Sequence, residues 1–280
     1  MPYPLEKLQY GLRRRLRELA TRSEAYALQV AAPNYIGFQP IQKVQTVFDT
    51  TFYIDRENNL EIIISPEYPT PTDSHEIPLW IVNHEIEIVN FTPKYQLNTI
   101  LDGFWLLPMK LYIYHCVLDM KFIQRLLNAI HNRIDNLWLL PCSFTSIKTA
   151  KMLCNAPALR AIKEFVIKEP TFPSATWWIK AFVEAGCTSL KSFDVINAPF
   201  SVFDIDRNIF LKFIKAQRNG FRLTFNMSAE EGLHMPAEDR IKELFDEYFE
   251  SRDFGKDLRK KKVVSLYFKN LSWCYVLRAD

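Results

Sequence analysis

Apolar residues return along this chain in short alternating groups at a nearly constant interval. The groups Leu137–Leu139, Phe165–Ile167, Phe193–Val195 and Phe221–Leu223 begin 28 residues apart. Alternation of apolar and other side chains is typical of a strand with one buried face. Self-similarity with a period between about 20 and 50 residues indicates a stack of repeated structural units. The pattern therefore predicts an α/β solenoid of strand and helix units.

The first group carries the apolar skeleton L-x-x-L-x-L-x-x-C of a leucine-rich repeat. A single strand and helix cannot bury their own apolar faces, so at least about three units must stack to form a core. The matching positions are Ile134, Leu137, Leu139 and Cys142; Ile162, Phe165 and Ile167; Leu190, Phe193 and Val195; and, 26 residues before the first group, Leu111, Ile113 and Cys116. The alternative is an ordinary α/β domain whose units have equal lengths by coincidence.

The stretches between the predicted strands have apolar residues three and four positions apart, which is the spacing of an amphipathic helix. Gly186 and Gly220 each follow such a stretch, where the C-terminal cap of a helix is expected. The positions are Met120, Ile123, Leu126, Leu127 and Ile130; Ile147, Ala150, Lys151 and Cys154; Trp178, Ala181, Phe182 and Ala185; and Phe210, Phe213 and Ile214. Each predicted strand is thus followed by a predicted helix.

Residues 40–100 alternate like strands, and the segment 37–100 is expected to form a β-rich region that connects to the stack. Val44–Phe48 and Thr51–Ile54 are separated from Leu60–Ile64 by the polar turn Asp55–Asn59, which predicts a hairpin. Glu85–Val89 is a candidate first strand of the stack. Four prolines between positions 66 and 78 indicate an exposed loop.

The repeat pattern is interrupted near the C-terminus. The next strand-like run after Phe221 is Val263–Phe268, and an insertion separates the two. The insertion contains a predicted acidic helix, Asp239–Glu250, and the basic run Arg259–Lys262. Such a run is usually a solvated turn, with nuclear import or phosphate contact as alternatives. Terminal units of a stack are often atypical because they cap it.

The N-terminal segment has a different pattern, a narrow row of leucines with arginines opposite. Leu5, Leu8, Leu12, Leu16 and Leu19 fall three or four residues apart and predict one helix. Thr21 and Glu24 then form a T-x-x-E capping box, which predicts a second helix ending before Pro33. About 30 residues bury too little surface alone, so these helices must pack on the first repeat or on a partner.

The same segment resembles an F-box. Pro4, Glu6 and Leu8 match its opening P-x-E-x-L, and Tyr3–Leu8 together with the residues 31–34 is similar to the start of a large group of nematode F-box proteins. The resemblance implies a substrate receptor of a cullin-RING (SCF-type) ubiquitin ligase, with domains at 1–36 (F-box-like), 37–100 (connecting) and 101–280 (leucine-rich-repeat-like). By the resemblance, a Skp-type adaptor would contact Pro4, Leu5, Leu8, Leu12 and Leu16.

Composition and charge limit the remaining possibilities. The 280 residues are 48% hydrophobic, so a large core is expected. The formal net charge of +3 is nearly balanced, so the overall charge does not indicate a nucleic-acid partner. No run approaches about 18 apolar residues and no secretory signal is evident, so we expect no membrane partner and a cytoplasmic or nuclear location. The five scattered cysteines predict free thiols, and no cofactor or metal motif is present.

Strand alternation predicts which side chains bind the target. Leu137 and Leu139 fill the core, so Trp138 between them faces the open, concave side of the sheet. Exposed tyrosine and tryptophan are typical of protein-binding surfaces. The same parity selects Tyr112, Tyr114, Trp138, Leu140, Val166, Lys168, Asp194, Ile196, Arg222 and Thr224 as target-binding residues. The alternative is that the connecting region or its loop covers this face.

These patterns predict a non-catalytic receptor that binds an adaptor through its N-terminus and a target protein through its repeats. Two alternatives remain: a repeat scaffold without a ligase, or a module that neutralises a foreign protein such as a toxin by binding it. An enzyme is not expected, because His84, Glu85 and Glu87 fit an ordinary exposed strand and no nucleophile, acid and base set can be named.

Overall fold

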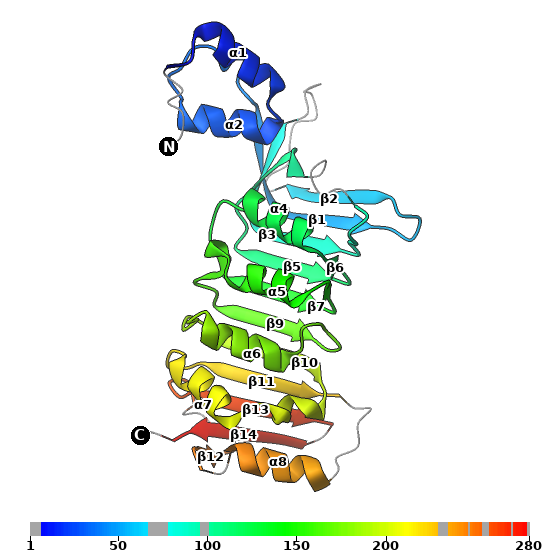
Figure 1. The fold of residues 1–280 in the computed structure, drawn as a ribbon, viewed down its shortest axis with the longest axis vertical. Coiled ribbons are helices and arrows are strands. Elements are labelled where there is room, and N and C mark those ends of the chain that lie inside the picture. The colour runs from blue at the N-terminus through cyan, green and yellow to red at the C-terminus, as the bar shows by residue number, and fades with distance from the viewer. Residues whose placement is uncertain are drawn as a thin grey trace.

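The computed structural model describes residues 7–66, 78–95, 101–228, 235–245, 247–253, 258–269 and 271–278. It is an α/β fold built on one long, mostly parallel sheet of 12 strands, with helices packed along one side (Figure 1). In the described part of the chain, no helix is long and apolar enough to cross a membrane.

The strands follow one another across the sheet nearly in chain order, β12-β14-β13-β11-β10-β9-β7-β5-β3-β1-β2, and β4 pairs with β3. In the order β1, β3, β5, β7, β9, β10, β11 and β13, each strand is parallel to the next. Antiparallel strands extend the sheet at its two ends, with β2 beside β1, β14 beside β13, and β12 beside β14. Their bounds are β1 Val44–Ile54, β2 Leu60–Pro66, β3 Leu79–Val89, β4 Phe104–Leu106, β5 Lys110–Tyr114, β7 Asn136–Leu140, β9 Glu164–Lys168, β10 Ser192–Ala198, β11 Arg222–Met227, β12 Phe249–Ser251, β13 Val263–Phe268 and β14 Leu271–Leu277. The short strands β6 Val117–Leu118 and β8 Ser143–Phe144 pair separately.

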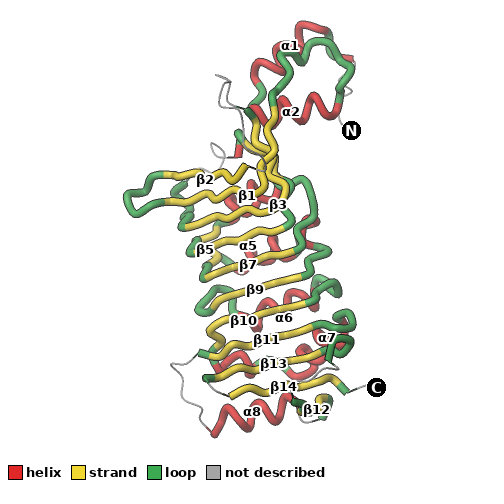
Figure 2. Tube along the Cα trace, turned by 180° about the vertical axis from the view of Figure 1, so that it is seen from behind, coloured by secondary structure: helices red, strands yellow, loops and turns green. Residues whose placement is uncertain are grey.

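Seven α-helices occur in the described residues: α1 Tyr10–Leu19, α2 Arg22–Ala31, α4 Met120–Ala129, α5 Ile147–Cys154, α6 Ala175–Glu184, α7 Arg207–Ala216 and α8 Met235–Phe245. The helices α4 to α7 cover one face of the sheet, and the reverse view shows the strands on the other (Figure 2). Side-chain caps set where α4 and α7 begin, because Asp119 accepts from Phe122 N and Asp206 accepts from Ile209 N. The positions of α4 to α7 confirm the sequence prediction.

The buried side of the sheet is a ladder of apolar side chains. Leu111, Leu137, Phe165, Phe193 and Leu223 lie beside one another on five successive strands, and all are buried. The intervals between them are 26, 28, 28 and 30 residues, so the predicted alignment of Phe221 with Phe193 is wrong by two. Phe221 is also buried, but it precedes β11 and packs against the α7 residue Phe213.

The middle of the core is aromatic and dense. The Phe165 ring lies 5.1 Å from Trp178, 5.1 Å from Phe182 and 5.0 Å from Phe193, measured between ring centroids. Such edge and tilted contacts stabilise a core beyond the burial of apolar area alone. Strand-to-strand and strand-to-helix packing therefore meet at this one side chain.

Two predicted elements near the C-terminus need correction. The acidic helix, predicted as Asp239–Glu250, is Met235–Phe245 in the structure, and Phe249 and Glu250 belong to the strand β12. Gly220 has φ +80 but stands four residues after the end of α7, in a turn where an added Cβ would lie 2.7 Å from the Arg259 carbonyl oxygen. Gly220 therefore allows a close approach of two backbones and is not the helix cap. Gly186, with φ +65, directly follows the α6 cap residue Ala185 as predicted.

The connecting region belongs to the same sheet. The predicted hairpin forms as β1 and β2, although β1 runs without a break from Val44 to Ile54. The predicted strand Glu85–Val89 is the second half of β3, which is parallel to both β1 and β5. The predicted segments 37–100 and 101–280 thus share one sheet, and the predicted loop after β2 lies outside the described residues apart from its flanks.

The helices α1 and α2 stand beyond the end of the sheet that holds β1 and β2 (Figure 1). The capping box predicted at Thr21 and Glu24 is confirmed and starts α2. Tyr26 of α2 packs edge-on against Trp105 at 5.2 Å, and Ser23 N donates to the Asp102 carbonyl. In contrast, α1 has no buried residue. This helix begins at Tyr10, so Leu8 precedes it, contrary to the sequence prediction; Pro4 and Leu5 lie outside the described residues.

Candidate interaction surfaces

The sheet face opposite α4 to α7, here called the open face, collects nearly all the predicted target-binding side chains. Parallel pairing places them in rows across the strands, with Tyr112 beside Trp138 and Tyr114 beside Leu140. The next strands continue the two rows with Val166 and Asp194, and with Lys168 and Ile196. Arg222 and Thr224 follow on β11. Residues separated by more than 80 positions in the chain therefore form one continuous surface.

Three aromatic rings form a patch on this face, named here the aromatic patch: Tyr112, Tyr114 and Trp138. The centroid of Tyr112 is 4.9 Å from Trp138 and 6.3 Å from Tyr114. All three side chains are half-buried, and Trp138 Nε1 has no hydrogen-bond partner among the described residues. Indole N–H groups usually find a partner when buried, so this donor is suited to a ligand that accepts a hydrogen bond.

One predicted contact residue is not exposed. Val166 is only 5% exposed, although strand pairing places it between Trp138 and Asp194 on the open face. Lys168 and Arg222 are exposed, and Leu140, Asp194, Ile196 and Thr224 are half-buried. Alternation correctly selects the face of the sheet, but it cannot show how far neighbouring side chains cover a small residue. Val166 is therefore removed from the set of contact candidates.

Carboxylates border the aromatic patch. Burial and, after it, the nearby Glu85, Glu164 and Glu87 carboxylates together raise the pKa of the Tyr112 phenol to about 12. Burial also raises the pKa of Glu85, with Asp49 adding to the shift and Lys110, whose Nζ lies 3.7 Å from Glu85 Oε2, opposing it. The surface around the rings is therefore both partly desolvated and negative.

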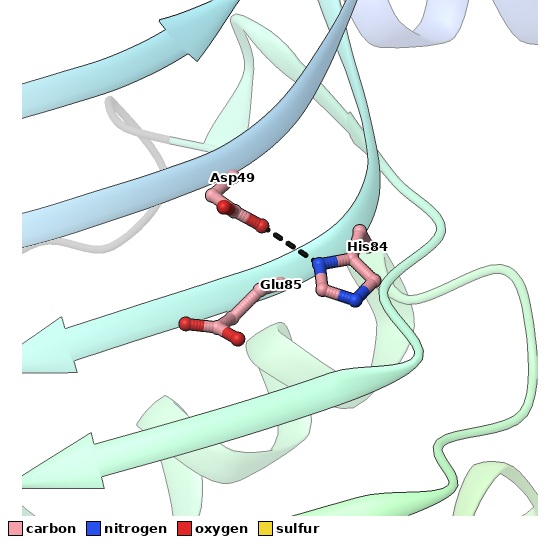
Figure 3. Close-up of side chains that lie close together, drawn as sticks. All are labelled: Asp49, His84 and Glu85. Atoms are coloured by element: carbon pink, nitrogen blue, oxygen red, sulfur yellow. Dashed lines mark hydrogen bonds and ion pairs between the residues drawn. The ribbon is translucent and has the colours of Figure 1, made fainter. Parts of the chain in front are cut away.

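A break in the strand alternation brings Asp49, His84 and Glu85 together at the edge of this face (Figure 3). Val47 pairs with Val82 but Asp49 pairs with Glu85, so β3 has a bulge. Val82 and Ile86 are buried while the three residues between them are not, which turns His84 out of the core. His84 Nδ1 lies 2.9 Å from Asp49 Oδ1, and its ring stacks on Phe48 at 4.1 Å.

The Asp49, His84 and Glu85 side chains could in principle hold a divalent cation, since their ligand atoms lie within 4.8 Å of one another. A cation at this place would have to displace the contact between Asp49 and His84 and compete with the Lys110 ammonium. For catalysis, Asp49 and His84 supply a carboxylate and a base, but no serine, cysteine or threonine hydrogen-bonds to His84 within the described residues. The geometry therefore favours a polar network that fixes the bulge.

The second surface is apolar and lies on α1 and α2; it is named here the terminal surface. Leu12, Leu16 and Leu19 are 55%, 37% and 67% exposed. Leu16 and Leu19 also line a groove of about 530 Å³ with Ala27, Leu28 and Ala31 of α2. Clustered exposed leucines mark interaction sites more often than single ones do. Leu8, just before α1, is half-buried.

The basic run also has a defined position. Lys260, Lys261 and Lys262 line a depression of about 570 Å³ with Lys215 and Arg278. Lys262 Nζ donates to the Lys215 carbonyl and Lys261 lies 3.7 Å from Glu250, so part of the run is held by local contacts. These contacts agree with the predicted turn and leave the alternatives of import and phosphate contact as predictions.

The cysteines are free thiols, as predicted. Burial raises the pKa of Cys142 to about 11 and that of Cys154 to about 12, so neither is a thiolate near neutral pH. Cys142 Sγ donates to the Ile113 carbonyl at 3.1 Å, and Cys116 Sγ to the Ile88 carbonyl at 3.5 Å, each on the preceding strand of the stack. Cys116 and Cys142 therefore contribute to the packing between neighbouring strands.

Comparisons with known proteins do not assign the chain to a family. No protein-family model matches it, and neither the curated proteins nor the solved structures contain a match. Inferences about function therefore rest on the two surfaces themselves.

Proposed function

We propose that this protein is a substrate receptor of the F-box type, which holds a Skp-type adaptor at its N-terminus and a target protein on its sheet. The observation that carries the proposal is the terminal surface, where Leu12, Leu16 and Leu19 are exposed along one regular helix. Apolar surface of this kind is stabilised when another protein covers it. The open face is a second surface, away from the first, so both partners can be bound at once.

The finer description of the fold supports this proposal. We infer a leucine-rich-repeat-like stack, because the buried ladder keeps intervals of 26 to 30 residues over five strands and two cysteines hold the same place in successive units. Stacked repeats bury only neighbour contacts and leave an extended face for binding. Receptor function follows from tethering, since a target held near a ligase has a raised effective concentration there.

Binding to a purified Skp-type adaptor tests the proposal and separates it from a scaffold without a ligase. The full chain mixed with the adaptor is expected to elute as a single complex in size-exclusion chromatography with light scattering. Elution of the chain apart from the adaptor at every concentration tested would contradict the proposal. It would favour the two alternatives that have no ligase, a scaffold or a neutralising module.

Replacement of Trp138 by alanine is expected to weaken target binding by at least about thirty-fold. Aromatic hot spots commonly lose about 2 kcal/mol or more on truncation, and Trp138 is the largest ring of the aromatic patch. Quantitative mass spectrometry of proteins captured by wild type and variant measures the change. Tyr267→Ala, at an exposed ring farther along the same sheet, is the matched control and should leave capture unchanged. A sharp fall in melting temperature with target capture intact would place Trp138 in the core instead.

A further inference from the structure

The charge of the open face differs from that of the chain. From β1 to β10 its charged side chains are five carboxylates, Asp49, Glu85, Glu87, Glu164 and Asp194, against two lysines, Lys110 and Lys168. The formal charge of this face is therefore −3 from β1 to β10 and −2 when Arg222 of β11 is included, whereas the whole chain carries +3. The basic side chains of the protein are mainly elsewhere, so the negative field belongs to this face.

The carboxylates lie around the aromatic patch rather than at random. Glu87 pairs with Tyr112 in the same row, and Glu85 lies one row away on the same strand. On the other side, Glu164 lies on β9, next to the strand of Trp138. Thr51 Oγ1 donates to Glu87 at 2.9 Å, and Asn136 donates to Glu164, so neutral side chains orient both carboxylates without cancelling their charge.

Lys110 cancels one of these carboxylates in part. Its Nζ is 3.7 Å from Glu85 Oε2, which is at the outer limit of an ion pair and is partly exposed. Pairs of this kind contribute little energy and exchange readily. Lys168 is exposed and lies two residues after Val166 on β9, whereas Glu164 lies two residues before it. Glu87, Glu164 and the three rings are half-buried, so each keeps some exposed surface for a cation on the ligand.

We infer that the aromatic patch receives an arginine-bearing basic segment of the target protein, with the guanidinium against the rings and hydrogen-bonded to the surrounding carboxylates. This rests on the proposed function only in that the segment belongs to the recruited target. Aromatic faces attract cations, tryptophan most strongly, and carboxylates pair with guanidinium in a planar, two-point geometry. Arginine fits better than lysine because its planar group stacks on rings and bonds to carboxylates at once.

Binding of short labelled peptides to the full chain, followed by fluorescence anisotropy without adaptor, tests this inference. The probes are unstructured peptides that alternate serine with arginine, lysine, glutamate or leucine. We expect the arginine peptide to bind more tightly than the other three, and its affinity to fall as salt is raised. The triple variant Glu85→Gln, Glu87→Gln, Glu164→Gln should weaken arginine-peptide binding by roughly tenfold, and Trp138→Ala by a similar factor.

The matched control makes the same change of net charge on other surfaces, with Glu57→Gln, Glu184→Gln and Glu247→Gln. Circular dichroism should give the folded spectrum for every variant. Preference for the glutamate or leucine peptide would overturn the inference, as would equal losses in the two triple variants. Because adaptor binding is measured separately, a chain that binds adaptor but not the arginine peptide would refute the ligand class and leave the proposed function intact.

Discussion

The double substitution Leu12→Ala and Leu16→Ala is expected to abolish adaptor binding while leaving the fold as stable as before. Both side chains lie on α1, which has no buried residue, so their removal opens no cavity in the free protein. In a complex they would be covered, and each buried leucine then contributes about 2 to 5 kcal/mol. The loss from two leucines is about 4 kcal/mol even at the lower limit, which is roughly 700-fold in affinity. Titration calorimetry with purified adaptor measures it.

A change on the same helix provides the control. Arg14 and Arg15 both pair with Glu18 on the exposed side of α1, at 3.1 and 3.4 Å. Their replacement by alanine alters charge but not the leucines, and we expect adaptor affinity to change by less than about fivefold. Unchanged adaptor binding by the leucine variant, with loss in the arginine variant, would mean that the basic side of α1 is the contact surface.

Phe165→Ala is expected to lower the free energy of unfolding by about 3 to 5 kcal/mol, the usual cost of removing a large buried aromatic side chain. Phe165 is fully buried and contacts rings from α6 and from the neighbouring strand β10. Its loss therefore weakens both the packing within one unit and the packing between units. Chemical denaturation, monitored by circular dichroism, gives the change.

Phe172→Ala is the matched control for this core variant, because Phe172 is 47% exposed. It should change the free energy of unfolding by less than about 1 kcal/mol. Similar losses for both variants would show that the 165 position does not lie at the centre of a packed core, and the assigned ladder of strands would then be wrong.

Much of the fold could be predicted because strand and helix periods are local. Leu137 and Leu139 alternate with Trp138, and this alone places the ring on the open face. The apolar spacing in Met120–Ala129 and the T-x-x-E box at Thr21 similarly predict helices where the structure has them. These patterns depend only on backbone geometry and on which side of each element is buried.

Features that depend on pairing between strands could not be predicted in the same way. Phe221 and Leu223 are both buried and apolar, so the sequence offers two registers, and contacts of the whole strand select Leu223. The bulge at Asn83 and His84 likewise depends on β1, although the missing alternation between Val82 and Ile86 is a signal for it. Val166 is buried although its place in the alternation is that of an open-face residue, so the local pattern does not reveal its burial.

The N-terminal segment shows another limit. The leucine spacing correctly predicts an apolar row, but it does not show where the helix begins, and α1 starts after Leu8. Helix starts depend on capping, and Gln9 at this position makes no side-chain cap. The adaptor residues that the resemblance implies therefore reduce, among the described residues, to Leu12 and Leu16 on α1 with Leu8 beside it.

Hydrogen–deuterium exchange of the full chain with and without a purified Skp-type adaptor tests the central claim most directly. The proposal predicts slower exchange over α1 and α2, residues 10–31, and unchanged exchange in β5, β7 and β9, whose open face stays available for a target. Slower exchange confined to the sheet strands, or no change at saturating adaptor concentration, would contradict the assignment of the terminal surface as the adaptor site.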